Sequence, residues 1–173
     1  MVARLSRRRY LEGAALATVV LAGCGGPAGD GEDGAAGLQG SDYPPVDEWL
    51  TDTTVGDADD TYDGTLVDLR DNDEVDIDVG SEGNGGNFAF GPSAAVVSVD
   101  TTVRWVWTGE GDAHNVEADP EEQLGLSDYT FTSGQPVESD SEVYTQTLDG
   151  TGVALYHCEP HLGVGMKGGI AVE

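Results

Sequence analysis

The chain has 173 residues, and its 33 acidic side chains far outnumber its 7 lysines and arginines, for a formal net charge of −26. This balance excludes a nucleic-acid-binding function, because the phosphate backbone needs positive charge opposite it. Low hydrophobicity with high charge is also typical of disordered chains, but 38% of the residues are apolar and regular strand patterns follow residue 75. Strong acidity favours solubility in concentrated salt, where screening shortens to about 3 Å at 1 M. We therefore expect a halophilic (salt-loving) source.

Residues 1–23 have the pattern of an export signal. Adjacent arginines at positions 7–9 precede an apolar run, Gly13 to Ala22, that is too short to span a bilayer. The arginines resemble a twin-arginine signal, and Leu-Ala-Gly-Cys at 21–24 resembles a lipobox, whose cysteine is lipidated after cleavage. We predict a twin-arginine lipoprotein signal peptide over 1–23 and a lipid anchor on Cys24, which would hold the exported protein on the outer face of the cell membrane. The alternative is cleavage elsewhere, with Cys24 incidental.

The next two stretches carry little that could form a core. Gly, Ala, Asp and Glu dominate residues 24–45, which we interpret as a flexible linker. Two prolines at its end favour the start of a short helix, in which Val46, Trp49 and Leu50 share one face. Residues 46–74 are otherwise acidic and have no continuous helix or strand pattern. We expect them to form an irregular N-terminal arm that packs on the main domain.

From residue 75 onward, short alternating segments are bounded by Gly, Asp and Ser, which is the pattern of β-strands. In the segment from 102 to 108, Val103, Trp105 and Trp107 fall on one face, which we assign to the core. Seven or eight short strands without long helices predict an all-β fold, a Greek-key β-sandwich over residues 75–173. The predicted strands are 75–79, 88–90, 96–99, 102–108, 129–132, 143–148, 152–157 and 168–172.

One loop near the C-terminus gathers side chains that bind soft metals. Cys158, His161 and Met166 supply a thiol, an imidazole and a thioether. Two nitrogens and a thiolate in a plane, with a weak axial sulfur, are the ligands of an electron-transfer copper centre. Taken singly, the cysteine could be buried and inert and the methionine could be core filler, but three such residues in one bend make coincidence a poor explanation.

The backbone of this loop is also suited to bring its donors together. Pro160 fixes φ just before His161 and limits the conformations of the bend. Gly163 and Gly165 would leave the backbone free to swing Met166 back over the plane of the other ligands.

The second nitrogen must come from elsewhere in the chain, and His114 is the best candidate. It follows the strand 102–108 after a Gly-rich turn, so one pole of a sandwich could bring it to Cys158. His157 is the competing ligand, but it neighbours Cys158 on a strand and the two side chains should point to opposite faces. A surface imidazole in an acidic loop is the alternative interpretation of His114.

At this point a family resemblance is plain. Cys158-x-Pro-His161-x4-Met166, with His114-Asn115 upstream, resembles the small blue copper proteins of the plastocyanin/cupredoxin family. The acidic composition, the twin-arginine lipobox start and the Gly/Asn-rich stretch 82–90 resemble the halocyanin branch. The resemblance implies a cupredoxin fold of about eight strands, one copper ion and one-electron shuttling. It also implies that Asn115 braces the cysteine loop and that His161 is the ligand nearest solvent, where the electron leaves.

Two positions depart from the pattern of the family. Ala113 stands where plastocyanins usually have proline before the upstream histidine. Asp100 or Thr101 falls where the turn before the tryptophan strand often has glycine, although aspartate tolerates left-handed backbone better than most residues.

The resemblance and the composition together predict a non-enzymatic, monomeric electron carrier whose partners are membrane-bound or soluble redox proteins. The alternative function is a copper carrier or storage protein, but such proteins tend to offer several exposed cysteines or methionines, and this chain has two of each in total. An oxidase or reductase would need a second metal site, for which two cysteines and three histidines leave no ligands. A structural zinc module would have a closed Cys/His set without methionine.

Overall fold

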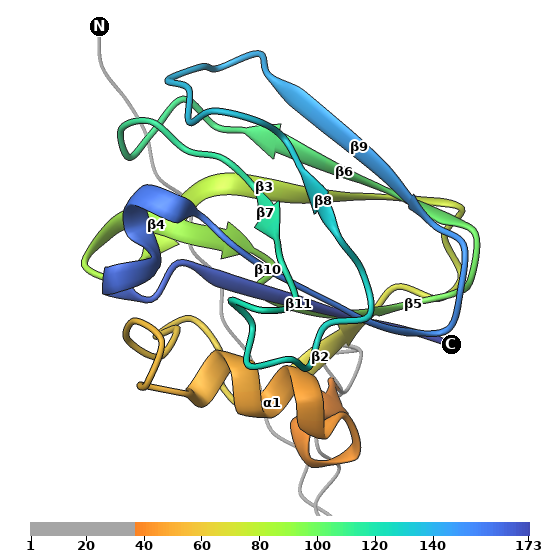
Figure 1. The fold of residues 1–173 in the computed structure, drawn as a ribbon. Coiled ribbons are helices and arrows are strands. Elements are labelled where there is room, and N and C mark those ends of the chain that lie inside the picture. The colour runs from red at the N-terminus through yellow and green to blue at the C-terminus, as the bar shows by residue number, and fades with distance from the viewer. Residues whose placement is uncertain (1–36) are drawn as a thin grey trace, which may run out of the picture. The chain divides into compact units, whose positions relative to one another are not determined.

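The computed structural model describes residues 37–173, whose strands form two facing β-sheets (Figure 1). The predicted signal peptide and Cys24 lie outside the described residues. In the part of the chain that is described, no helix has the length and apolar character needed to cross a membrane. The strands are β1 (Leu38–Gln39), β2 (Thr65–Asp68), β3 (Glu74–Gly83), β4 (Gly86–Gly91), β5 (Ala94–Val97), β6 (Thr101–Trp107), β7 (Glu117–Ala118), β8 (Phe131–Thr132), β9 (Val143–Leu148), β10 (Gly152–His157) and β11 (Lys167–Val172).

The two sheets form a sandwich of mixed strand directions. One sheet has seven strands in the order β1-β2-β5-β11-β10-β7-β8, and the other has four in the order β4-β3-β6-β9. Parallel pairs join β2 to β5, β5 to β11 and β3 to β6, whereas the remaining pairs are antiparallel. This arrangement confirms the all-β sandwich that the strand pattern predicted.

Alternating side chains from both sheets fill the space between them. Val103, Trp105 and Trp107 of β6 point inward and are buried, as their spacing predicted. Tyr156 of β10 reaches the same cluster, with its ring centroid 5.2 Å from that of Trp105. Cys158 and Met166 also belong to this core, so the loop 158–166 is anchored at both ends in the close-packed interior of the sandwich.

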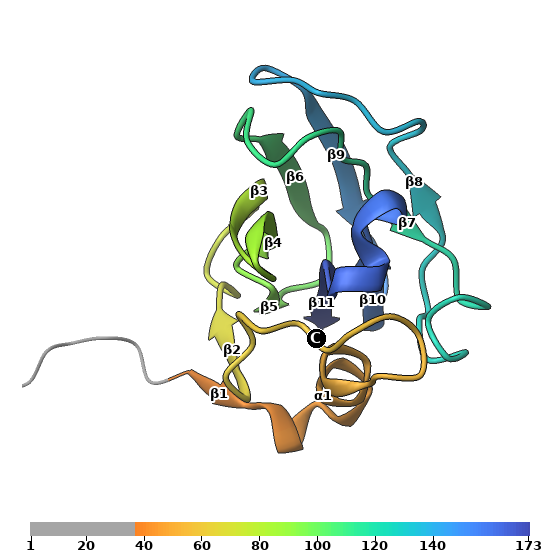
Figure 2. The same ribbon diagram turned by 90° about the vertical axis from the view of Figure 1, so that its left-hand side faces the viewer.

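A short helix covers the outer face of the seven-stranded sheet. Helix α1 (Pro44–Thr51) contacts β10 and β11, as Figures 1 and 2 show from two sides. Val46, Trp49 and Leu50 are fully buried in a second apolar cluster, which confirms the helix face that their spacing predicted. The indole N–H of Trp49 donates to the Tyr156 carbonyl at 3.2 Å. The helix is therefore an integral layer of the fold.

Strand boundaries differ from the sequence-based prediction where local pattern carries little information. Strands β9 and β10 begin and end where alternation placed them, whereas β1, β2 and β7 were not predicted. The pairing of Leu38 with Leu66 explains two of them, since these short strands depend on a partner distant in sequence. Ordered structure thus begins before residue 45, within the stretch whose composition indicated a linker. The helix and β2 likewise give regular structure to part of the segment 46–74, which was expected to be irregular.

Candidate metal centre

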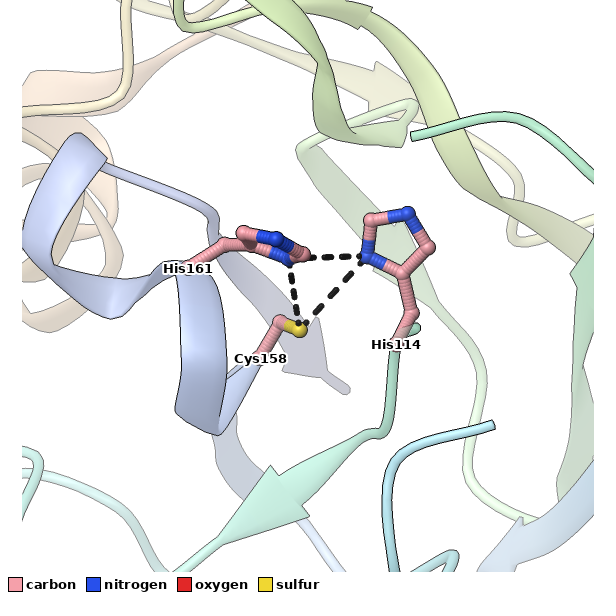
Figure 3. A group of neighbouring side chains, drawn as sticks. All are labelled: His114, Cys158 and His161. Carbon is pink, nitrogen blue, oxygen red and sulfur yellow. Dashed lines mark hydrogen bonds between the residues drawn. The ribbon is translucent and has the colours of Figure 1, made fainter. Parts of the chain in front are cut away.

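Three donor atoms from two loops converge at one pole of the sandwich (Figure 3). The Nδ1 atoms of His114 and His161 are 3.1 Å apart. The Cys158 Sγ lies 3.4 Å from the His161 Nδ1 and 3.6 Å from the His114 Nδ1. A point equidistant from all three atoms lies about 2 Å from each, close to the roughly 2.0 to 2.3 Å of zinc bonds to imidazole nitrogen and thiolate sulfur. The donor set therefore fits a single first-row metal ion.

The loop that carries two of these donors is a 3₁₀ turn, η2 (Glu159–Val164). Cys158 occupies its N-cap position and Pro160 lies in its first turn, where a missing N–H costs nothing. Gly165 ends the turn with φ of 97°, a left-handed conformation that favours glycine. Gly163 is not among the residues with positive φ. The expectation that both glycines redirect the chain is thus wrong for Gly163, because the helical turn carries the backbone through that position.

Met166 follows this turn and is fully buried. Its carbonyl accepts the N–H of Cys158 at 3.1 Å, and its own N–H donates to the His161 carbonyl at 3.2 Å. These backbone hydrogen bonds connect the three predicted ligands of the loop, Cys158, His161 and Met166, to one another. The Met166 side chain belongs to the same core cluster as Cys158, and a thioether is the kind of soft donor that serves as a weak fourth ligand in copper centres.

His114 is held with one ring nitrogen directed at the donor triangle. Its backbone forms a bridge with Val137, with bonds of 3.0 and 2.9 Å. Its Nε2 lies 2.9 Å from the Glu110 carbonyl, which can only accept, so Nε2 carries the proton and Nδ1 offers its lone pair. A Cβ on Gly111, whose φ is 84°, would overlap the Asn87 carbonyl and also crowd the His114 Nε2, which explains the glycine there. Burial lowers the pKa of His114 and so favours the neutral, metal-binding form.

His161 reaches the triangle from the solvent side. Its ring stacks on Phe88 at 4.4 Å between centroids and 25° between planes. The imidazole is half-buried, and the neighbouring Val164 is 43% exposed. The role of Phe88 was not predictable from the sequence, because a phenylalanine in a Gly-rich hairpin does not indicate which ring it will stack on.

Asn115 connects the two loops. Its Oδ1 accepts the N–H of Glu159 at 2.9 Å, and its Nδ2 donates to the Glu159 carboxylate at 2.6 Å and to the Gly134 carbonyl at 3.1 Å. Because Glu159 directly follows Cys158, these bonds fix the start of the ligand loop relative to the His114 loop. This contact is the one that the family resemblance implied for Asn115.

The chemistry of Cys158 depends on a bound cation. Burial raises the pKa of its thiol to about 11, although the backbone N–H groups of Asn115 and His161 oppose this rise. The thiol alone is therefore protonated at neutral pH. A metal ion at the triangle would displace that proton and hold the sulfur as thiolate.

His157 lies outside the triangle. Its Nδ1 accepts from the Gln123 amide at 2.9 Å, and its Nε2 lies 3.3 Å from the Glu122 carboxylate. The ring makes an edge contact with Trp49 on the helix-covered face of the sheet. Strand alternation thus separates it from Cys158, as the sequence indicated.

Two imidazole nitrogens and one cysteine sulfur on a β-sandwich, with a buried methionine in the same loop, define a small blue copper protein. A model of the family described as copper binding proteins, plastocyanin/azurin family, matches residues 76–173. Halocyanin from Natronomonas pharaonis is 41% identical over 98% of both chains. Plastocyanin from Scenedesmus fuscus is 32% identical over 57% of this chain and 100% of its own.

Among solved structures, oxidised plastocyanin from Dryopteris crassirhizoma covers 57% of this chain and 100% of its own, with a TM-score of 0.43 and 22% identity. The family match and the halocyanin relative carry the assignment. The chain belongs to the plastocyanin/azurin family of copper binding proteins, with a cupredoxin fold and one copper ion as its cofactor.

Proposed function

We propose that this protein is a one-electron carrier that holds its copper ion with the Nδ1 atoms of His114 and His161, the Sγ of Cys158 and the axial sulfur of Met166. The observation that carries the proposal is the triangle of Nδ1, Nδ1 and Sγ atoms, with sides of 3.1, 3.4 and 3.6 Å. Bound copper supplies a centre that cycles between two oxidation states. The chain contributes ligands that are already in place, so that little needs to move when an electron is transferred.

Rigidity around the donors supports this role. His114 is fixed by the Glu110 carbonyl and by its bridge to Val137. Cys158 and Met166 are joined by a backbone hydrogen bond and buried in a dense core. Preorganised ligands with hydrogen-bonded outer partners are also the means by which proteins tune a metal site.

The electron would leave through the edge of His161. Of the four proposed ligands it is the one nearest solvent. The apolar side chains nearby are Phe88 and Leu162, which are partly exposed, and Val164, which is exposed. An apolar patch around an exposed redox ligand fits a brief encounter with another redox protein, since such interfaces are small and weak. The strong negative charge elsewhere on the chain keeps the carrier soluble and repels copies of itself.

We further propose that the carrier works as a monomer on the outer face of the cell membrane, after twin-arginine export and lipidation of Cys24, and that its partners are membrane-associated or soluble redox proteins. The arginine pair, the short apolar run and the Leu-Ala-Gly-Cys sequence support this. The mass of the mature protein tests it. Cleavage before Cys24 with an added lipid mass is expected, whereas an unmodified Cys24 in the mature chain would overturn the anchor.

A visible absorption spectrum recorded through a redox titration of the copper-loaded protein tests the carrier function. An intense blue band that bleaches and returns with one electron per protein is expected. Tight copper binding without that band would favour a carrier or storage role. Turnover of a substrate at the copper site would argue for an enzyme instead.

A further inference from the structure

A segment outside the matched family domain lies directly against the copper-ligand loop. The family model begins at residue 76, yet the chain between α1 and β2 passes beside η2 in both ribbon views (Figures 1 and 2). Gly56 approaches Leu162 so closely that a Cβ would overlap the Leu162 carbonyl. A Cβ on Gly165 would in turn overlap the Ala58 carbonyl. We name residues 52–62 the brace.

One side chain joins the brace to the copper loop. Asn84 lies at the turn between β3 and β4 with φ of 55°. Its Oδ1 accepts the N–H of Asp60 at 2.9 Å, and its own N–H donates to the Asp60 carboxylate at 2.6 Å. Its Nδ2 donates to the carbonyls of Phe88 at 2.8 Å and Gly165 at 3.1 Å. A single amide thereby links the brace, the β3–β4 hairpin and the ligand loop.

The two carbonyls that Asn84 holds belong to neighbours of two copper ligands. Gly165 immediately precedes Met166, and Phe88 stacks on the ring of His161. On the other side of Met166, the side chain of Lys167 is fully buried and reaches the brace. The Lys167 ammonium donates to the Asp52 carbonyl at 2.8 Å and lies 4.6 Å from the Trp49 ring centroid. The loop is thus connected to the brace on both sides of Met166, through Asn84 at Gly165 and through the side chain of Lys167.

We infer that Asn84 and the brace position Met166 and the Phe88–His161 stack, and so set the reduction potential of the copper ion. The inference deepens the proposed function and rests on it. Neither Asn84 nor the brace contributes a donor atom to the triangle, so they act through the ligands. The axial ligand is a main determinant of potential in such centres, and outer hydrogen bonds fix where a ligand lies.

Removing the Asn84 amide should loosen the loop on the side of the axial sulfur. The variant Asn84→Gly keeps the positive φ at no steric cost and loses both carbonyl contacts. With a weaker hold on Met166, the axial interaction weakens and the potential rises. The Asp60 N–H also loses its acceptor, the Asn84 Oδ1. Loss of these bonds should also raise the exchange rate of the Met166 amide about tenfold.

The test compares three variants with the wild type. Asn84→Gly removes the link, and Asp60→Ala weakens it from the exposed brace side if the first variant does not fold. Asp100→Gly is the matched control, because it also replaces a non-glycine residue at positive φ, 72°, and lies in the turn before β6 rather than beside the brace. Reduction potential and visible spectrum are measured on the copper-loaded proteins. Amide exchange over residues 159–166 is measured on the metal-free proteins.

The inference would be supported if Asn84→Gly or Asp60→Ala raised the reduction potential, altered the relative intensities of the visible absorption bands and sped up amide exchange in the loop, while the control variant stayed like the wild type. A lower thermal stability with wild-type potential, spectrum and loop exchange would overturn it, because the contact would then serve folding alone. If the wild-type protein itself shows no blue band with copper, the proposed function fails. The exchange data would still show whether the brace holds the loop.

Discussion

Replacing Asn115 by alanine should weaken both the fold and the copper site. The side chain is fully buried and makes three hydrogen bonds, two of them to Glu159, the residue after Cys158. Its two donor bonds contribute about 0.5 to 1.5 kcal/mol each, and a Glu159 amide left without its acceptor costs about 1 kcal/mol or more. Together they predict a loss of about 2 to 4 kcal/mol in the free energy of unfolding.

Urea unfolding of the metal-free protein measures this loss, and a competition titration measures copper affinity. Loss of an outer hydrogen-bond partner typically weakens metal binding about 10- to 100-fold. The control is Asn72→Ala, since Asn72 is exposed and its side chain donates only to the Leu69 carbonyl, at 3.1 Å. The reasoning would be refuted if both variants lost the same small amount of stability and bound copper as the wild type does.

Three further predictions concern the helix, the neighbouring histidine and the axial ligand. Trp49→Ala should cost about 3 to 5 kcal/mol in urea unfolding because a fully buried indole is lost; a cost near zero would mean that the helix is dispensable. Burial lowers the pKa of His157 from its ordinary 6.5 to about 4, so on acidification the unfolded chain takes up this proton first and the metal-free protein loses stability. Between those two pH values the free energy of unfolding of the wild-type protein should fall by up to about 3 kcal/mol more than that of the His157→Gln variant. Parallel curves of stability against pH for the two proteins would contradict this. Met166→Leu should keep the blue colour and raise the potential, measured by redox titration, whereas a lower potential would count against an axial role for Met166.

The parts of the fold that were predictable are those that local pattern determines. Alternation along β6 indicated which of its side chains face the core. The alternation of neighbouring residues in a strand also separated His157 from Cys158. The left-handed backbone of Asp100, with φ of 72°, agrees with its position in a turn where the family often has glycine. The donor spacing in the loop 158–166 indicated a copper site from the amino-acid sequence alone.

The parts that were not predictable depend on contacts between segments distant in sequence. The Glu110 carbonyl fixes the tautomer of His114, but a backbone acceptor leaves no trace in composition. The stacking of Phe88 on His161 depends on the register of the β3–β4 hairpin. Asn84 looked like an ordinary turn residue in a Gly/Asn-rich stretch, and its bonds to Asp59, Asp60, Phe88 and Gly165 become apparent only when three segments meet.

The proposed electron-carrier function requires that His114, Cys158 and His161 bind the same copper ion. X-ray absorption at the copper edge of the fully loaded protein measures this most directly. We predict a nearest shell of two nitrogens at roughly 2.0 Å and one sulfur at roughly 2.3 Å. A shell of nitrogen and oxygen alone, without a short sulfur distance, would contradict it.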